Sequence, residues 1–156
     1  MTTASPSFKK LKGADSLTRF FAEKGVKQYM ATSTPRSLIG AKLAPHNDMI
    51  NRFDGIVTAD DVVHGKPAPD IFLKASELAG VPPNRCIVFE DSPLGVQGGL
   101  AGGMHVVAIA FPGFDHSLFK GACQVRLDIV FFLHSVDCRK SITVRLHCIP
   151  DGEICL

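Results

Sequence analysis

The sequence VFEDSPLGVQGG, which spans residues 88–99, joins an apolar run to two adjacent acids and then to a glycine-rich segment. The residues before the acids, CIVF over 86–89, are uniformly apolar, which is typical of a strand buried on both faces. Pro93 suits the first turn of a helix, and a helix is therefore predicted over 93–103. A buried strand that ends on Glu90 and Asp91 raises the question of what these two carboxylates bind.

Apolar runs alternate with helical patterns along most of the chain. Strands are predicted over 26–31, 55–60, 86–91 and 105–110. Three further helices are predicted: one capped by Asp15 or Ser16 and ended by Gly25, one over 36–43, and one from Pro69 to the residue before Gly80. Because the strands are continuous apolar runs separated by helices, the predicted fold class is α/β, with a Rossmann-like parallel sheet and flanking helices.

Composition excludes several classes of partner. The 156 residues suit one domain, and the net charge of +2 is too small to indicate binding to nucleic acid or to an anionic membrane. The longest apolar run, 129–133, is far shorter than a membrane span. The five cysteines are odd in number and form no C-x-x-C pair, so a reducing, cytoplasmic location is expected.

Polar side chains are predicted at the carboxyl ends of three strands, the edge where parallel α/β sheets bind ligands. Thr32 and Ser33 end the first strand, Lys66 follows the second, and Glu90 and Asp91 end the third. Hydroxyl groups and a lysine suit phosphate oxygens, while carboxylates suit Mg²⁺. The sequence therefore predicts a site for a phosphate with a divalent cation.

Each of these residues also has an ordinary structural explanation. Thr32 and Ser33 are typical of a turn or a helix cap, and Lys66 alone is typical of a solvated surface. The two acids are compatible with an exposed strand end in which Asp91 caps the next helix. The combination in this order along the chain is more specific than any one member.

Three segments carry a resemblance to a known family. The sequences ATST, GKPAPDIF and VFEDSPLGV resemble motifs of the haloacid dehalogenase-like superfamily, in its phosphatase and β-phosphoglucomutase-like branch. The resemblance covers roughly residues 11–128. It implies a Mg²⁺-dependent phosphomonoester hydrolase that acts on a small phosphorylated metabolite, and a phosphosugar mutase is the alternative, because the same motifs serve both.

The resemblance also implies roles for the candidate residues. Thr32, with Ser33, would bind phosphate, and Lys66 would bind phosphate and offset charge at the nucleophile as a catalytic group. Glu90 and Asp91 would form the metal site, with Asp91 as the direct or water-mediated ligand.

The sequence departs from the family pattern in its central catalytic motif. Members of the family use an aspartate nucleophile in a D-x-D motif at the end of a first strand, and this chain contains no D-x-D. The helical cap that normally precedes the segment beginning at Asp15 is missing too. We therefore expect an incomplete core that is inactive as an isolated chain. The alternative is a non-catalytic isoform or fragment that binds a phosphate or a full-length relative.

The glycines after Asp91 are a second departure. Gly98, Gly99 and Gly102 would each cost roughly 1 kcal/mol relative to alanine inside a helix. The expected organisation is a flexible arm over 1–10, a partial haloacid dehalogenase-like core over 11–128 and a divergent tail over 129–156.

A missing nucleophile strand would leave a gap in the sheet. In the family that strand is central, between the strands that here are 26–31 and 86–89, so two exposed inner edges and self-association through them are expected. The tail contains two β-like runs, 129–133 and 141–147. We predict that Ile129–Leu133 pairs within the sheet or across a dimer; the alternative is an unfolded, aggregation-prone tail.

Overall fold

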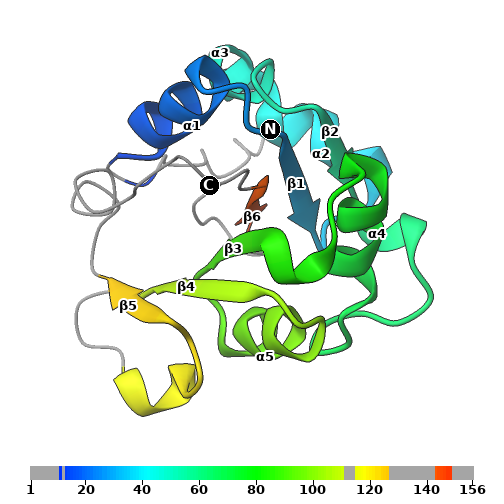
Figure 1. The fold of residues 1–156 in the computed structure, drawn as a ribbon. Helices are drawn as coiled ribbons and strands as arrows, with labels where there is room; N and C mark the ends of the chain where they lie inside the picture. The colour runs from blue at the N-terminus through cyan, green and yellow to red at the C-terminus, as the bar shows by residue number, and fades with distance from the viewer. Residues whose placement is uncertain (1–10, 12, 111–114, 127–142, 149–156) are drawn as a thin grey trace.

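The structure is a computed structural model that describes residues 11, 13–110, 115–126 and 143–148. Six parallel strands form one sheet in the order β2-β1-β6-β3-β4-β5, with helices on both faces (Figure 1). The strands are β1 (Gln28–Thr32), β2 (Gly55–Val57), β3 (Cys86–Glu90), β4 (His105–Ile109), β5 (Gln124–Arg126) and β6 (Thr143–Cys148). The α/β fold with a parallel sheet is confirmed.

The part of the chain that the structure describes also contains five α-helices and four 3₁₀-helices; α1 precedes β1, and the others lie between strands. They are α1 (Ala14–Glu23), α2 (Arg36–Leu43), η1 (Ala44–His46), α3 (Asn47–Ile50), η2 (Ala59–Asp61), α4 (Asp70–Ala79), η3 (Pro83–Arg85), α5 (Pro93–Ala101) and η4 (His116–Phe119). Across the described ranges, no helix is long and apolar enough to cross a membrane.

Helix boundaries follow the predicted glycines more closely than the predicted caps. Gly25 and Gly80 follow α1 and α4 with φ of 66° and 65°, the left-handed conformation that ends a helix. The predicted start of α1 at Asp15 or Ser16 is wrong, because Gly13 precedes the first helical residue and Asp15 lies within the first turn. Pro69 is likewise the cap of α4 instead of its first residue.

Both faces of the sheet are covered by apolar side chains, which explains the continuous apolar strands. Under α1, α2 and α3 lies a cluster that includes Leu17, Phe21 and Phe89. Under α4 and α5 lies a second cluster that includes Phe72 and Val88. Alternate residues of the same strands belong to the two clusters. Both faces of the sheet are therefore buried, and the strands are apolar at successive positions.

Strand β6 occupies the middle of the sheet, between β1 and β3 (Figure 1). Its backbone pairs Met30 with Leu146 on one side and Phe89 with Leu146 on the other. The gap predicted between these strands is therefore filled, and the inner edges expected to be exposed are both paired. The prediction that Ile129–Leu133 fills this position is wrong, because residues 143–148 form the strand between β1 and β3. Ile129–Leu133 lies outside the described residues.

The glycines of α5 allow close packing against neighbouring elements. A Cβ on Gly99 would lie 2.8 Å from Val106 Cγ2, and one on Gly98 would lie 3.2 Å from the Pro67 carbonyl oxygen. Gly102 differs from the prediction, because it follows the end of α5 and is not inside the helix. Gly98 and Gly99 lower the helix propensity of α5, but they also allow the helix to pack closely against β4 and the loop before α4.

Candidate functional site

Lys66 and Glu90 form a buried ion pair at the carboxyl edge of the sheet. Lys66 lies in the segment between β2 and α4, and its Nζ is 3.0 Å from Glu90 Oε2, at the end of β3. The two side chains are 6% and 0% exposed. The Lys66 ammonium also lies 4.9 Å from the centre of the Phe72 ring. The alternative of a solvated lysine is wrong, and the two predicted site residues are in direct contact.

The other carboxylate oxygen of Glu90 is held by Ser92. The Ser92 backbone N–H and its hydroxyl donate to Glu90 Oε1 at 3.2 and 2.9 Å. The Ser92 hydroxyl oxygen in turn accepts from Gly95 N at 3.0 Å and so caps α5. The alternative in which Asp91 caps this helix is therefore wrong.

Gly95 provides the space that the Glu90 side chain occupies. A Cβ built on Gly95 would overlap with Glu90 Cδ, so that one of the two would have to move. The Glu90 carboxylate is thus fixed from three sides: by Lys66, by Ser92 and by the backbone of α5. Ser92 and Gly95 are not among the predicted site residues, although a serine directly before Pro93 is a recognisable helix-cap signal.

Asp91 is buried without a complete set of partners. The residue is 6% exposed, and its Oδ1 makes no hydrogen bond among the described residues. Burial, reinforced by the negative charge of Glu90, raises the pKa of Asp91 to about 8. Burial also lowers the pKa of Lys66, against the opposing attraction of Glu90 and Asp91.

This arrangement fits a hard divalent cation. A cation beside Asp91 would supply the partner that Oδ1 lacks and would favour the ionised carboxylate. Among the residues that the structure describes, no three or more His, Cys, Asp or Glu side chains gather in one place. A cation at Asp91 would therefore complete its coordination with water or with oxygens of a bound phosphate.

The predicted hydroxyl residues lie at the same edge but are placed differently. Thr32 is fully buried and its Oγ1 accepts from Thr34 N at 3.1 Å, whereas Ser33 is exposed. In β6, Cys148 pairs with Thr32 of β1, and Leu146, two residues earlier, pairs with Phe89 of β3. Asp91 follows Phe89 by two residues, so the backbones of Thr32 and Asp91 lie at the same level of the sheet. They are separated by two strand spacings, or roughly 9.5 Å. The structure brings them to one edge without direct contact.

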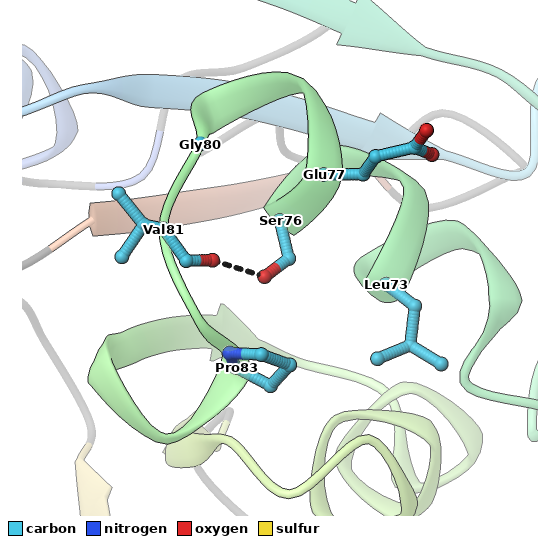
Figure 2. A pocket seen from close by; sticks show the side chains of 6 residues that line it. All are labelled: Leu73, Ser76, Glu77, Gly80, Val81 and Pro83. Carbon is cyan, nitrogen blue, oxygen red and sulfur yellow. Dashed lines mark hydrogen bonds between the residues drawn. The ribbon is translucent and has the colours of Figure 1, made fainter.

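A separate hollow lies at the opposite edge of the sheet. It measures about 340 Å³ and lies between the C-terminal half of α4 and η3, lined by Leu73, Ser76, Glu77, Gly80, Val81 and Pro83 (Figure 2). The Ser76 hydroxyl, which faces it, already donates to the Val81 carbonyl at 2.5 Å. The lining has one acid and no cation, so its chemistry does not suit a phosphate.

Comparisons with known proteins agree with this geometry. Residues 6–103 match the family of haloacid dehalogenase-like hydrolases. The chain is 38% identical over 125 residues to "Probable pseudouridine-5'-phosphatase" of Drosophila melanogaster, and 50% identical over 98 residues to Hexitol phosphatase A of Escherichia coli. A hydrolase from Pseudomonas syringae superposes with a TM-score of 0.71 at 30% identity.

The matches cover much of this chain but less of the relatives. They cover 77%, 63% and 81% of this chain, respectively. The corresponding shares of the relatives are 54%, 39% and 61%. The chain thus spans about half the length of the proteins that it resembles.

Proposed function

Because this chain belongs to the haloacid dehalogenase-like hydrolase family, we propose that its buried Lys66–Glu90–Asp91 cluster binds Mg²⁺ and the phosphate of a small phosphorylated metabolite. The observation that carries the proposal is Asp91, a buried carboxyl group beside a buried ion pair, with one oxygen that has no hydrogen-bond partner in the described part of the chain. The names of the two curated relatives denote phosphatases of small phosphorylated molecules, which supports this substrate class.

Each residue has a role that its contacts support. Asp91 is the direct or water-mediated cation ligand, and Glu90 is the second acid of the metal site, held by Lys66 and Ser92. Lys66 retains donor protons beyond the one that faces Glu90, and these suit phosphate oxygens. Thr32 and Ser33 bind phosphate from the end of β1. When bound, Mg²⁺ supplies positive charge that offsets the charge of the phosphate.

The reaction that the family resemblance implies is phosphomonoester hydrolysis, with phosphosugar transfer as the related chemistry. Either reaction needs a nucleophile, and the sequence contains no D-x-D pair to provide it. We therefore propose that this chain alone binds without turnover. The second candidate function is binding without catalysis, to a phosphate or to a full-length relative. The lack of a D-x-D pair in the sequence favours this candidate too.

Thermal unfolding with and without Mg²⁺ tests the cation site. Excess Mg²⁺ is expected to raise the Tm of the wild-type chain by several degrees, because it binds only the folded state. Asp91→Asn should remove most of this shift. The exposed Asp48 provides a matched control, and Asp48→Asn should respond as the wild type does.

Two outcomes would contradict the proposal. An equal Mg²⁺ shift in the wild type and in Asp91→Asn would show that the cation binds elsewhere. If Mg²⁺ did not change the Tm of the wild type, Glu90 and Asp91 would be a structural end of β3 and not a cation site. Inorganic phosphate added with Mg²⁺ should raise the Tm further, and Lys66→Met should abolish this additional shift.

A further inference from the structure

Asp70 joins the two ends of the loop that carries Lys66. This loop runs over 64–70, and Asp70 is the first residue of α4. Asp70 Oδ2 accepts from the His64 backbone N–H at 3.2 Å and lies 3.0 Å from His64 Nδ1. The hydrogen bond with the His64 ring holds the pKa of Asp70 below its ordinary value, so Asp70 is a carboxylate that can only accept. Both ends of the loop are thus fastened at one carboxylate oxygen.

The backbone inside this loop is fixed at two more places. Ala68 N donates to the Gly65 carbonyl oxygen at 3.0 Å, which closes a turn that contains Lys66. The Ala68 carbonyl oxygen lies 3.2 Å from the position that a Cβ on Gly98 would take, so the loop packs against the backbone of α5. The direction in which the Lys66 side chain leaves the loop is therefore set by the contacts of the loop itself.

We propose that Asp70 is a positioning residue, which acts through His64 to hold Lys66 where its ammonium group meets a phosphate. This inference rests on the proposed function, in which Lys66 donates to phosphate oxygens. A lysine side chain loses conformational freedom when it binds a ligand, and a loop that already holds the lysine lowers this entropic cost. The buried pair of Lys66 and Glu90 agrees with a lysine that is held in place before a ligand arrives.

The contact between Asp70 and His64 is too exposed to contribute much to global stability. The side chains of His64 and Asp70 are 71% and 31% exposed, and water and salt weaken ion pairs of this kind. A role in stability alone predicts a small change in Tm and no change at Lys66 when Asp70 is replaced. A positioning role predicts a change at Lys66 even where the Tm is nearly constant.

Acetylation of the folded, metal-free chain with N-hydroxysuccinimidyl acetate measures how firmly Lys66 is held. Peptide mapping by mass spectrometry gives the rate at each lysine, with the exposed Lys24 as the internal reference. Asp70→Ala removes both hydrogen bonds with His64. Asp70→Asn keeps one carbonyl oxygen, which is enough because both donors meet a single oxygen in the wild type.

Asp54→Ala is the matched control. Asp54 also accepts from a backbone N–H, that of Gln28 at 2.8 Å, and from the Lys27 ammonium at 2.7 Å, but it lies just before β2 at the amino edge of the sheet. His64→Ala is a milder second variant, because it removes the ring and keeps the backbone donor. The Tm of each variant shows that it is folded.

In Asp70→Ala, acetylation of Lys66 relative to Lys24 is expected to rise by about fivefold, which corresponds to the net contribution of one hydrogen bond. His64→Ala should give a smaller rise, and Asp70→Asn and Asp54→Ala should react as the wild type does. Equal Lys66 rates in the wild type and Asp70→Ala would overturn the inference. An equal rise in Asp54→Ala would also overturn it, because the effect would then be a general loosening of the fold.

The affinity for inorganic phosphate in the presence of Mg²⁺ separates this inference from the proposed function. Calorimetric titration should show that Asp70→Ala binds phosphate about fivefold more weakly than the wild type, the cost of immobilising one long side chain on binding. Mg²⁺ alone should raise the Tm of both chains equally, because Asp91 is unchanged. A wild type that binds no phosphate would contradict the proposed function, and the acetylation rates would still decide whether Asp70 positions Lys66. Equal phosphate affinity in the two chains would overturn the inference and leave the proposed function intact.

Discussion

Glu90 and Asp91 are neighbours in the sequence, but their surroundings give them different properties. Glu90 has Lys66 on one oxygen and Ser92 on the other, whereas Asp91 has a buried oxygen without a partner among the described residues. The sequence predicted that both acids belong to one site. It could not predict this division, because the difference depends on a lysine 24 residues away and on the direction of each side chain.

The pKa of Asp91 predicts a pH dependence of stability in the metal-free protein. The pKa is about 8 in the folded chain, against an ordinary value of 3.8 in an unfolded chain, so above pH 3.8 ionisation favours the unfolded state. The free energy of unfolding should carry a contribution from Asp91 that falls from about pH 4 to about pH 8 and then levels off. Urea unfolding across this range should show that Asp91→Asn removes this fall.

Four other aspartates contribute to the pH dependence of stability outside this range. Asp15, Asp54, Asp61 and Asp70 all have lowered pKa values, so their contributions to stability change below this range. Asp48→Asn serves as the control and should retain the wild-type profile. Parallel profiles for the wild type and Asp91→Asn would contradict the assignment of a proton to Asp91 at neutral pH.

Gly95→Ala is predicted to destabilise the fold by about 3 kcal/mol or more. Its Cβ would collide with Glu90 Cδ, and displacement of that carboxylate would leave Lys66 as a buried charge without its partner. Gly40→Ala in α2 is the matched control. A Cβ at Gly40 would meet no atom of the described residues within 4 Å, so alanine there should stabilise the fold by roughly 0.5–1 kcal/mol. Denaturant titration that gave both variants the same sign would contradict the packing argument.

At the scale of elements, the features predicted correctly are those encoded locally. The ends of α1 and α4 follow from Gly25 and Gly80, since a left-handed residue after a helix is a short-range signal. The central position of β6 is different, because parallel pairing joins segments that are distant in sequence. The run 129–133 is continuously apolar, as an inner strand usually is, whereas 143–148 alternates polar and apolar residues. Composition therefore favoured the wrong segment for the position that β6 takes.

Strand β6 provides a direct test through Arg145. The backbone pairings place Arg145 between Tyr29 of β1 and Val88 of β3, in an inner strand. A β-branched residue has a higher strand propensity than arginine, so Arg145→Val should raise the free energy of unfolding by roughly 1 kcal/mol. Arg85→Val at an exposed position of η3 is the control and should change it by less than about 0.5 kcal/mol. A stability loss in Arg145→Val, measured by urea unfolding, would argue against β6 in this position.

At the scale of the whole molecule, the chain shares its fold with a solved relative and spans about half of the length of its relatives. The family resemblance places the nucleophile strand in the centre of the sheet, and β6 has that position here. The sequence of β6, TVRLHC, contains no carboxylate. The residues proposed to bind phosphate and cation thus lie on both sides of a central strand that lacks the aspartate nucleophile of the family.

The purified chain is therefore predicted to show no appreciable turnover of a generic aryl phosphate with Mg²⁺. Release of the coloured phenol should not exceed that of Asp91→Asn prepared in the same way. Turnover that persists through repeated purification and is abolished by Asp91→Asn would contradict this prediction. That result would also show that a residue outside a D-x-D pair acts as the nucleophile.

The central position of β6 also determines when the sheet can be completed. β6 is the last described strand along the chain, yet it pairs Gln28 with Val144 and Cys86 with Thr143. Contacts between residues so far apart form slowly, because long loops must close first. During translation, β1 and β3 leave the ribosome before β6, and their facing edges can meanwhile pair with other nascent chains. The protein is therefore most exposed to aggregation during its own synthesis, the interval in which a chaperone that covers strand edges would act.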